Sequence, residues 1–382
     1  MWRCILLVWI TEFGWAQLLL SPESPQEREL KRFFQSSDGV KESPGMRLRC
    51  GVYTFPTRLS FGFQHWTGYD ITIPVRQFSD RGRERPMVIA IQVTPEATGK
   101  TPAYLYSKAA FPRRAPPQFW TTGNAEMNLG GGFVVGEGKY RINLWVMDSS
   151  GRTCRKDWKI EARAQGVPLQ IGPGEIAESG MESWKGMSGG TGKLSVLIHA
   201  APMFRRRIMT KLSAWDRAVL LNSLRSLLDT GGYAEAAVKV FDFDGRRIIF
   251  ESDNFGAPDF ELLMDALMNL SLGTVSFDTL KGVNEEGFLS NLVRDEVAMK
   301  QPSDAVVFLG PSWRWGQKIS PLLRELRSQL PATYYLSLTP WNATATDLLE
   351  KFVKAGPKGK VLTVYQPIDL AKAIREIRDR RN

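Results

Sequence analysis

The spacing of apolar residues changes once along this chain, and that change divides it into two parts. Residues 46–164 alternate between apolar and polar side chains, the pattern of β-strands that cover a core with one face. Beyond residues 165–192, short apolar runs alternate with stretches of helical periodicity. Residues 165–192 are rich in Gly, Pro and Ser, which is typical of a linker. The chain has 382 residues, enough for two domains, and we expect one on each side of this linker.

The first part is expected to be an antiparallel β-sandwich. Its clearest strand pair spans residues 139–162, where two alternating runs flank the turn Asp148-Ser149-Ser150-Gly151. Lys156 interrupts the second run, which predicts an edge strand, and Gly130-Gly131-Gly132 is interpreted as a turn. About five to seven short strands without helices resemble immunoglobulin-like or fibronectin-like modules over residues 46–164. The remaining strands are expected at residues 46–53, 69–75, 87–93, 103–106 and 133–135.

The N-terminus has the features of a secretory signal. Arg3 precedes a short apolar run, and Gly14-Trp15-Ala16 places small residues where a signal peptidase cuts. We expect residues 1–16 to be removed after Ala16 and the mature protein to be secreted or periplasmic; a buried N-terminal helix or strand is the alternative. Residues 17–45 are expected to form a mostly flexible leader with one short helix.

Export changes the meaning of the three cysteines. Cys4 leaves with the signal, so the mature chain keeps Cys50 and Cys154. A pair of cysteines in an oxidising compartment predicts one disulfide between the two sheets. Two buried free thiols are the alternative, because the sequence does not give the distance between them.

The second part is expected to be a doubly wound α/β domain over residues 193–382. The turn Asp244-Gly245 lies between two of its strands and predicts one antiparallel hairpin in an otherwise parallel sheet. Ser213 and Asp216 form a capping box at the start of a helix. Strands are expected at residues 194–198, 236–241, 247–251, 305–309, 334–338 and 361–365, and helices at 213–231, 258–270, 285–300, 320–329, 346–354 and 368–380.

This order of elements resembles the von Willebrand factor A-type domain. The resemblance implies a divalent cation at the carboxyl end of the sheet, held by an Asp-x-Ser-x-Ser motif, a Thr and a further Asp. In this chain the first motif is replaced by His199-Ala200-Ala201-Pro202-Met203, and Leu309-Gly310-Pro311 offers no Asp after the fourth strand. Thr274 is the candidate for the Thr position. A hard cation needs several oxygen ligands, so we expect a degenerate member without metal or cofactor.

The same end of the sheet is where a doubly wound domain binds ligands. Trp and Arg are the residues that most often anchor protein interfaces, and several of them follow the strands of this domain. We therefore expect a non-catalytic adhesion or scaffold protein that binds a protein partner with this rim. The expected rim residues are His199, Met203, Arg205, Arg206, Arg207, Thr274, Trp313, Arg314 and Trp315.

Two other functions remain as alternatives. One is an α/β hydrolase that uses His199 as a base, and the other is a cation-dependent binding domain with a nonstandard site. Gly186-Met187-Ser188-Gly189-Gly190 matches a nucleophile elbow, but a strand follows it where the elbow requires a helix. Asp242 and Asp244 are interpreted as exposed turn residues away from the ligand-binding crevice.

The charge balance narrows the class of partner. The chain has 50 Lys and Arg against 40 Asp and Glu, a net charge of +10 at pH 7. An excess of this sign favours an acidic protein partner. No nucleic-acid motif accompanies it, and no apolar run approaches the ~18 residues of a membrane span.

Overall fold

The computed structural model describes two compact units. The first unit comprises Met1–Leu59, Gln64–Ala164 and Leu169–Gly180. The second unit comprises Ser60–Phe63, Gln165–Pro168 and Met181–Asn382. The described residues are 17–37, 47–78, 85–97, 99–111, 125–179, 184–187, 189–204, 210–273, 285–299, 301–312, 319–339 and 347–380.

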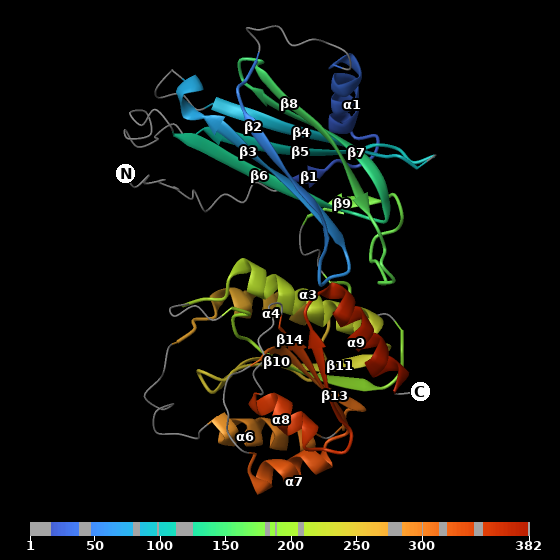
Figure 1. Ribbon diagram of the computed structural model, residues 1–382, viewed down its shortest axis with the longest axis vertical. Coiled ribbons are helices and arrows are strands. Elements are labelled where there is room, and N and C mark those ends of the chain that lie inside the picture. The colour runs from blue at the N-terminus through green and yellow to red at the C-terminus, as the bar shows by residue number, and fades with distance from the viewer. Residues whose placement is uncertain are drawn as a thin grey trace. The chain divides into compact units, whose positions relative to one another are not determined.

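The first unit contains two antiparallel sheets (Figure 1). The five-stranded sheet has the order β1-β5-β4-β7-β8. The four-stranded sheet has the order β2-β3-β6-β9. The strands are β1 (Leu18–Leu19), β2 (Gly51–Leu59), β3 (His65–Pro74), β4 (Arg85–Pro95), β5 (Ala103–Phe111), β6 (Glu126–Val135), β7 (Gly138–Asp148), β8 (Thr153–Ala162) and β9 (Ile176–Glu178), with a short 3-10 helix η2 (Val75–Gln77).

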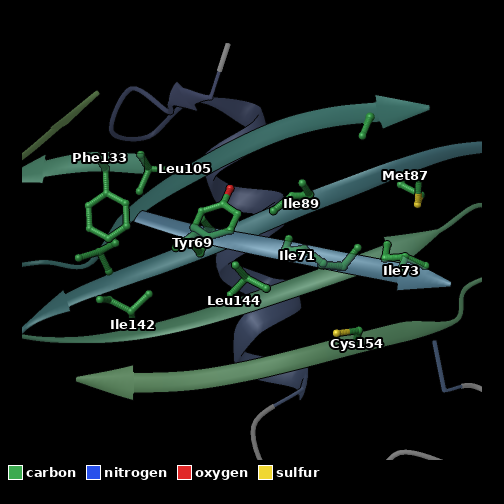
Figure 2. Packing of buried hydrophobic residues seen from close by; sticks show 14 of the residues in the cluster. Tyr69, Ile71, Ile73, Met87, Ile89, Leu105, Phe133, Ile142, Leu144 and Cys154 are labelled. Carbon is green, nitrogen blue, oxygen red and sulfur yellow. The ribbon is translucent and has the colours of Figure 1, made fainter. Parts of the chain in front are cut away.

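The core of this unit lies between the two sheets. Alternate residues of β3, including Tyr69 and Ile71, pack against alternate residues of β4 and β7, such as Ile89 and Leu144 (Figure 2). All four side chains are buried. The period-two pattern therefore directs one face of each strand into a shared core, as expected for a sandwich. The edge position predicted for the strand with Lys156 is confirmed, because β8 ends the five-stranded sheet.

The short helix expected in the leader is present as α1 (Pro25–Ser37), whose Phe33 packs edge-on against Trp145 at 5.2 Å, and the leader also contains β1, which pairs with β5. Two predictions for this unit were wrong, each because of a pairing between distant residues. The linker contains β9, which pairs with β6. The triplet Gly130-Gly131-Gly132 is not a turn but lies inside β6, paired with residues 68–70 of β3.

The second unit contains one mixed sheet with the order β12-β11-β10-β13-β14-β15. Five strands are parallel to their neighbours, and only the edge strand β12 runs antiparallel, which confirms the hairpin around Gly245. The strands are β10 (Lys193–His199), β11 (Glu235–Asp242), β12 (Arg247–Ser252), β13 (Ala305–Pro311), β14 (Ala332–Leu338) and β15 (Gly359–Val364).

Helices cover both faces of this sheet (Figure 1). One layer contains α3 (Ala214–Thr230), α4 (Ala257–Asn269) and α9 (Pro367–Asp379), and the other contains α6 (Glu285–Val297), α7 (Pro321–Gln329) and α8 (Leu348–Lys354). The capping box predicted at Ser213 and Asp216 is present at the start of α3. None of the helices in the described part of the chain is long and apolar enough to cross a membrane.

Candidate functional site

The carboxyl ends of the three central strands meet at one edge of the mixed sheet. β10 ends at His199, β13 at Pro311 and β14 at Leu338, and the strands are parallel and in register. The loops that follow parallel strands gather at this edge, which is where such sheets bind ligands. The side chains at this edge therefore form the candidate site.

His199 is fully buried beneath the edge. Its ring stacks on Phe241 at 5.6 Å between centroids and meets Phe243 edge-on at 5.0 Å. Its Nδ1 lies 3.3 Å from the carbonyl oxygen of Pro311. Because a carbonyl oxygen only accepts, Nδ1 carries the proton in this contact. This imidazole has no exposed surface and packs among the strand ends.

Tyr335 extends the same buried network. Its hydroxyl lies 3.1 Å from the oxygen of Pro311 and 3.0 Å from Oδ2 of Asp347, so one proton lies between two acceptors. Burial and the Asp347 carboxylate raise the pKa of Tyr335 well above its ordinary value. Asp347 also caps α8, accepting from the backbone N–H of Glu350 at 2.6 Å. The network joins β13, β14 and α8 at the edge.

Asp216 holds the loop that follows β10. One carboxylate oxygen accepts from the backbone N–H of Met203 at 2.9 Å. The other accepts from the N–H of Ser213 at 3.0 Å and from its hydroxyl at 2.6 Å. Asp216 is almost fully buried, so its hydrogen-bonding capacity is used within the loop and the cap.

The side chains that the structure describes at this edge do not form a site for a hard cation. Ala200 and Ala201 are buried and have no ligand atoms in their side chains. His199 packs against aromatic rings, and the carboxylate of Asp216 accepts hydrogen bonds from backbone N–H groups. Among the described residues there is no group of three or more His, Cys, Asp or Glu side chains that could hold a metal ion.

An exposed aromatic pair lies at the same edge and was not predicted. Phe204, which follows the loop after β10, stacks on Trp215 in the first turn of α3, with centroids 5.6 Å apart. The two side chains are 40% and 44% exposed. The stacked rings form a small apolar patch at this edge. The available signal was a Trp within the first turn of a capped helix, outside its leucine stripe.

The structure brings together only part of the predicted rim. Met203 is half-buried at the edge and His199 lies below it. The other predicted rim residues, and Ser188 of the elbow motif, lie outside the described residues. These rim residues are Arg205, Arg206, Arg207, Thr274, Trp313, Arg314 and Trp315.

Asp242 differs from its predicted role. It ends β11 at the carboxyl edge, and its side chain is almost fully buried. Oδ1 accepts from the backbone N–H of Asp244 at 3.0 Å, and Oδ2 lies 3.5 Å from Nε of Arg247. Burial raises the pKa of Asp242 in spite of these contacts. The buried carboxylate of Asp242 thus contacts two residues of the hairpin. The local sequence does not show that this side chain is buried.

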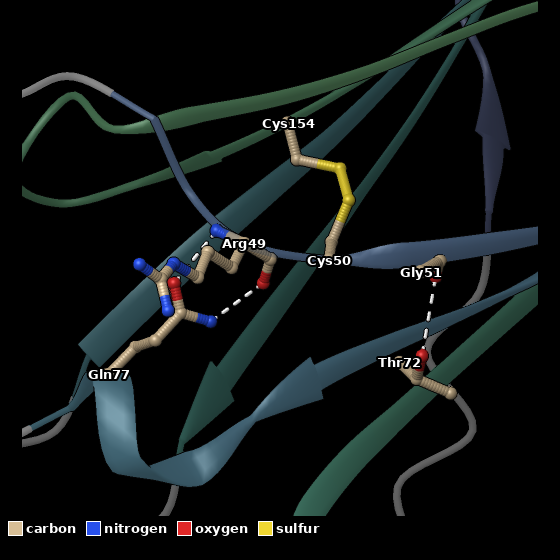
Figure 3. Close-up of a disulfide and its surroundings, with 6 residues drawn as sticks. All are labelled: Arg49, Cys50, Gly51, Thr72, Gln77 and Cys154. Atoms are coloured by element: carbon tan, nitrogen blue, oxygen red, sulfur yellow. Dashed lines mark hydrogen bonds between the residues drawn. A yellow bond between two sulfur atoms is a disulfide. The ribbon is translucent and has the colours of Figure 1, made fainter. Parts of the chain in front are cut away.

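The predicted disulfide between Cys50 and Cys154 is present. It joins the residue before β2 to β8, the edge strands of the two sheets of the sandwich, with Cα atoms 6.3 Å apart (Figure 3). Beside it the Gln77 amide donates to the oxygen of Arg49 at 2.6 Å and accepts from its N–H at 2.7 Å. The bridge and this paired contact fix the entry into β2.

Comparisons with known proteins do not identify the chain. No family model matches it, and no curated protein sequence matches it. A superoxide reductase (neelaredoxin) from Archaeoglobus fulgidus is 9% identical over 30% of this chain and 89% of its own, with a TM-score of 0.21. A glycosyl hydrolase family 2 member from Bacteroides cellulosilyticus is 8% identical over 80% of this chain and 36% of its own, with a TM-score of 0.19. Similarities this low carry no argument about activity.

Proposed function

We propose that this chain is an exported, non-catalytic protein that binds another protein with the carboxyl edge of a metal-free domain related to the von Willebrand factor A type. The observation that carries the proposal is the exposed stacked pair of Phe204 and Trp215. Aromatic side chains at the centre of a contact provide much of its binding energy.

The surroundings of the pair support this role over catalysis or cation binding. His199 is enclosed, and the Asp216 carboxylate is engaged by backbone groups. Arg205, Arg206 and Arg207 follow Phe204 directly in the sequence, so an acidic partner surface would complement this edge. The order of the mixed sheet, with its reversed third strand at one edge, supports the family resemblance. The disulfide supports an oxidising compartment.

The test is quantitative capture from the extracytoplasmic fraction of producing cells, with the purified protein as bait. We compare the wild type, the double variant Phe204→Ala/Trp215→Ala, and Leu262→Ala. Leu262 is a matched control, since it is an exposed apolar residue on α4. We expect a partner that the wild type and Leu262→Ala retain and the double variant loses, with no change when EDTA is added.

Two results would overturn the proposal. Equal capture by the double variant and the wild type would show that the aromatic pair binds nothing. Loss of capture in EDTA, with recovery on adding Mg²⁺ or Ca²⁺, would favour the cation-dependent alternative.

A further inference from the structure

Three aromatic residues lie on the face of the four-stranded sheet that is turned away from the sandwich core. Tyr69, Ile71 and Ile73 of β3 point into the core (Figure 2). Because side chains alternate along a strand, Trp66 and Asp70 point to the outer face. Phe55 pairs with Gly68 and Tyr53 with Asp70, so these two β2 residues share that face. We call Tyr53, Phe55 and Trp66 the aromatic shelf.

Glycines allow the indole of Trp66 to lie close against the sheet. A Cβ on Gly68 would fall 2.8 Å from the indole, and a Cβ on Gly132 would fall 2.7 Å from its Nε1. Nε1–H donates to Oγ of Ser179 at 3.0 Å, which holds the ring. The Phe55 ring stacks beside it at 5.8 Å with an interplanar angle of 30°. Trp66 is therefore a fixed ring that lies over strand backbone.

The shelf continues along β2 to Tyr53. Tyr53 is 64% exposed, the highest value among the large apolar side chains that the structure describes. It lies two residues from Phe55 on the same strand, about 7 Å away along its axis. The Tyr53 ring extends toward Gly51, where a Cβ would fall 3.6 Å from its Cε2 atom, so the shelf runs along β2 from Phe55 to Gly51. Tyr53 and the fixed indole of Trp66 lie on the same face of the sheet and outside the core, so this face presents aromatic surface.

Polar groups border the strip in register with the rings. Arg58 pairs with Trp66, and Asp70 pairs with Tyr53; both charged side chains are exposed. One acid and one base leave the border without net charge. The face thus combines flat apolar surfaces with a donor and an acceptor at its margin.

We propose that the aromatic shelf binds a neutral, β-linked saccharide chain. A pyranose ring with equatorial hydroxyls has an apolar face of C–H groups, which packs on an aromatic ring, and a polar perimeter, which hydrogen bonds to groups such as Arg58 and Asp70. A nucleic acid would require an excess of positive charge, and the two described border residues, Arg58 and Asp70, carry opposite charges. This site is on the sandwich and is independent of the rim proposed for protein binding.

The test is calorimetric titration of the full-length mature protein with cellohexaose and with chitohexaose, and with a heparin oligosaccharide as the charged comparison. Variants are Trp66→Ala, Tyr53→Ala and Gly132→Ala. The Gly132→Ala change keeps every ring but displaces the indole from the sheet, because the three atoms nearest the new methyl group all belong to the Trp66 side chain, at 2.7–2.9 Å. Tyr106→Ala is the matched control, since Tyr106 is a half-buried aromatic residue on β5 of the other sheet.

We expect at least one neutral hexasaccharide to bind the wild type and Tyr106→Ala equally, and each shelf variant to weaken that binding by about tenfold or more. Tyr53→Ala removes a mostly exposed ring, so it tests the proposal even where Trp66→Ala impairs folding. The proposal fails if neither neutral saccharide binds or if heparin alone binds. It also fails if Tyr53→Ala and Gly132→Ala leave the affinity for the neutral saccharide unchanged. It also fails if the variants abolish self-association in sedimentation without any saccharide binding, because the occupant is then a second copy.

Discussion

His199 and Tyr335 both contact the carbonyl oxygen of Pro311, at 3.3 and 3.1 Å. The two residues come from the strands that flank β13, so one backbone oxygen joins three neighbouring strands. We expect these buried hydrogen bonds to contribute to stability.

Removing the Tyr335 hydroxyl should destabilise the protein. Tyr335→Phe keeps the ring but leaves an oxygen of Asp347 with one partner fewer in a buried site. We expect the free energy of unfolding to fall by about 2 kcal/mol. Urea unfolding measures the change, and Tyr365→Phe, at an exposed position, is the control. Equal effects of the two changes would contradict a structural role for the network.

Gly310 is expected to tolerate no side chain. Its φ of +149° is one that other residues rarely adopt, and a Cβ would fall 2.6 Å from the oxygen of His199. Gly310→Ala should cost about 3 kcal/mol or more, measured by urea unfolding. Gly256→Ala is the comparison, because Gly256 has extended backbone and room for a methyl group, and it should cost about 1 kcal/mol at most. A small effect at Gly310 would show that the strands at this edge can separate.

The disulfide should stabilise the sandwich by restricting its unfolded state. Changing both Cys50 and Cys154 to Ser should lower the free energy of unfolding by about 2–4 kcal/mol. Reducing agent should produce a similar loss in the wild type and no further loss in the double variant. This expectation is contradicted if full reduction leaves the free energy of unfolding of the wild type unchanged.

Glu296 should make stability depend on pH. It is almost fully buried, and burial raises the pKa of its carboxyl group above the ordinary value of 4.5, against the lowering effects of Ser195 and Lys239. A folded-state pKa above the unfolded one contributes stability at low pH that is lost as the pH rises through the folded value. Glu296→Gln removes the titrating group. The free energy of unfolding of this variant, relative to that of the wild type, should therefore increase from pH 4 to pH 7.

Urea unfolding at several pH values tests this, with the exposed Glu325→Gln as the control for loss of one carboxylate. The prediction is contradicted if the free energy of unfolding of Glu296→Gln, measured relative to that of the wild type, stays constant or decreases as the pH rises.

Much of the architecture could be predicted from the sequence because the signals are local. The start of α3 follows from Ser213 and Asp216, which lie three residues apart and satisfy each other's backbone. The hairpin between β11 and β12 follows from Asp244-Gly245 between two apolar runs. Lys156 identified β8 as an edge strand, because a charged side chain interrupts a pattern that a central strand keeps.

Other features depend on residues far apart in the sequence. Gly130-Gly131-Gly132 looks like a turn until β3 lies beside it, where the missing side chains make room for Trp66 and Tyr69. Leu18–Leu19 and Ile176–Glu178 become strands only because a sheet edge is available to each of them. The carboxylate of Asp216 reaches Met203 only after β10 and α3 have packed.

The sequence by itself determined two domains of different class, most of their helices and strands, and the two cysteines that could pair. Only the tertiary structure decided which aromatic side chains lie outside the cores, among them the Phe204 and Trp215 pair and the aromatic shelf. The physical reason is that periodicity and capping act between residues a few positions apart. Exposure of a side chain is instead set by every segment that packs around it, and this information is not local.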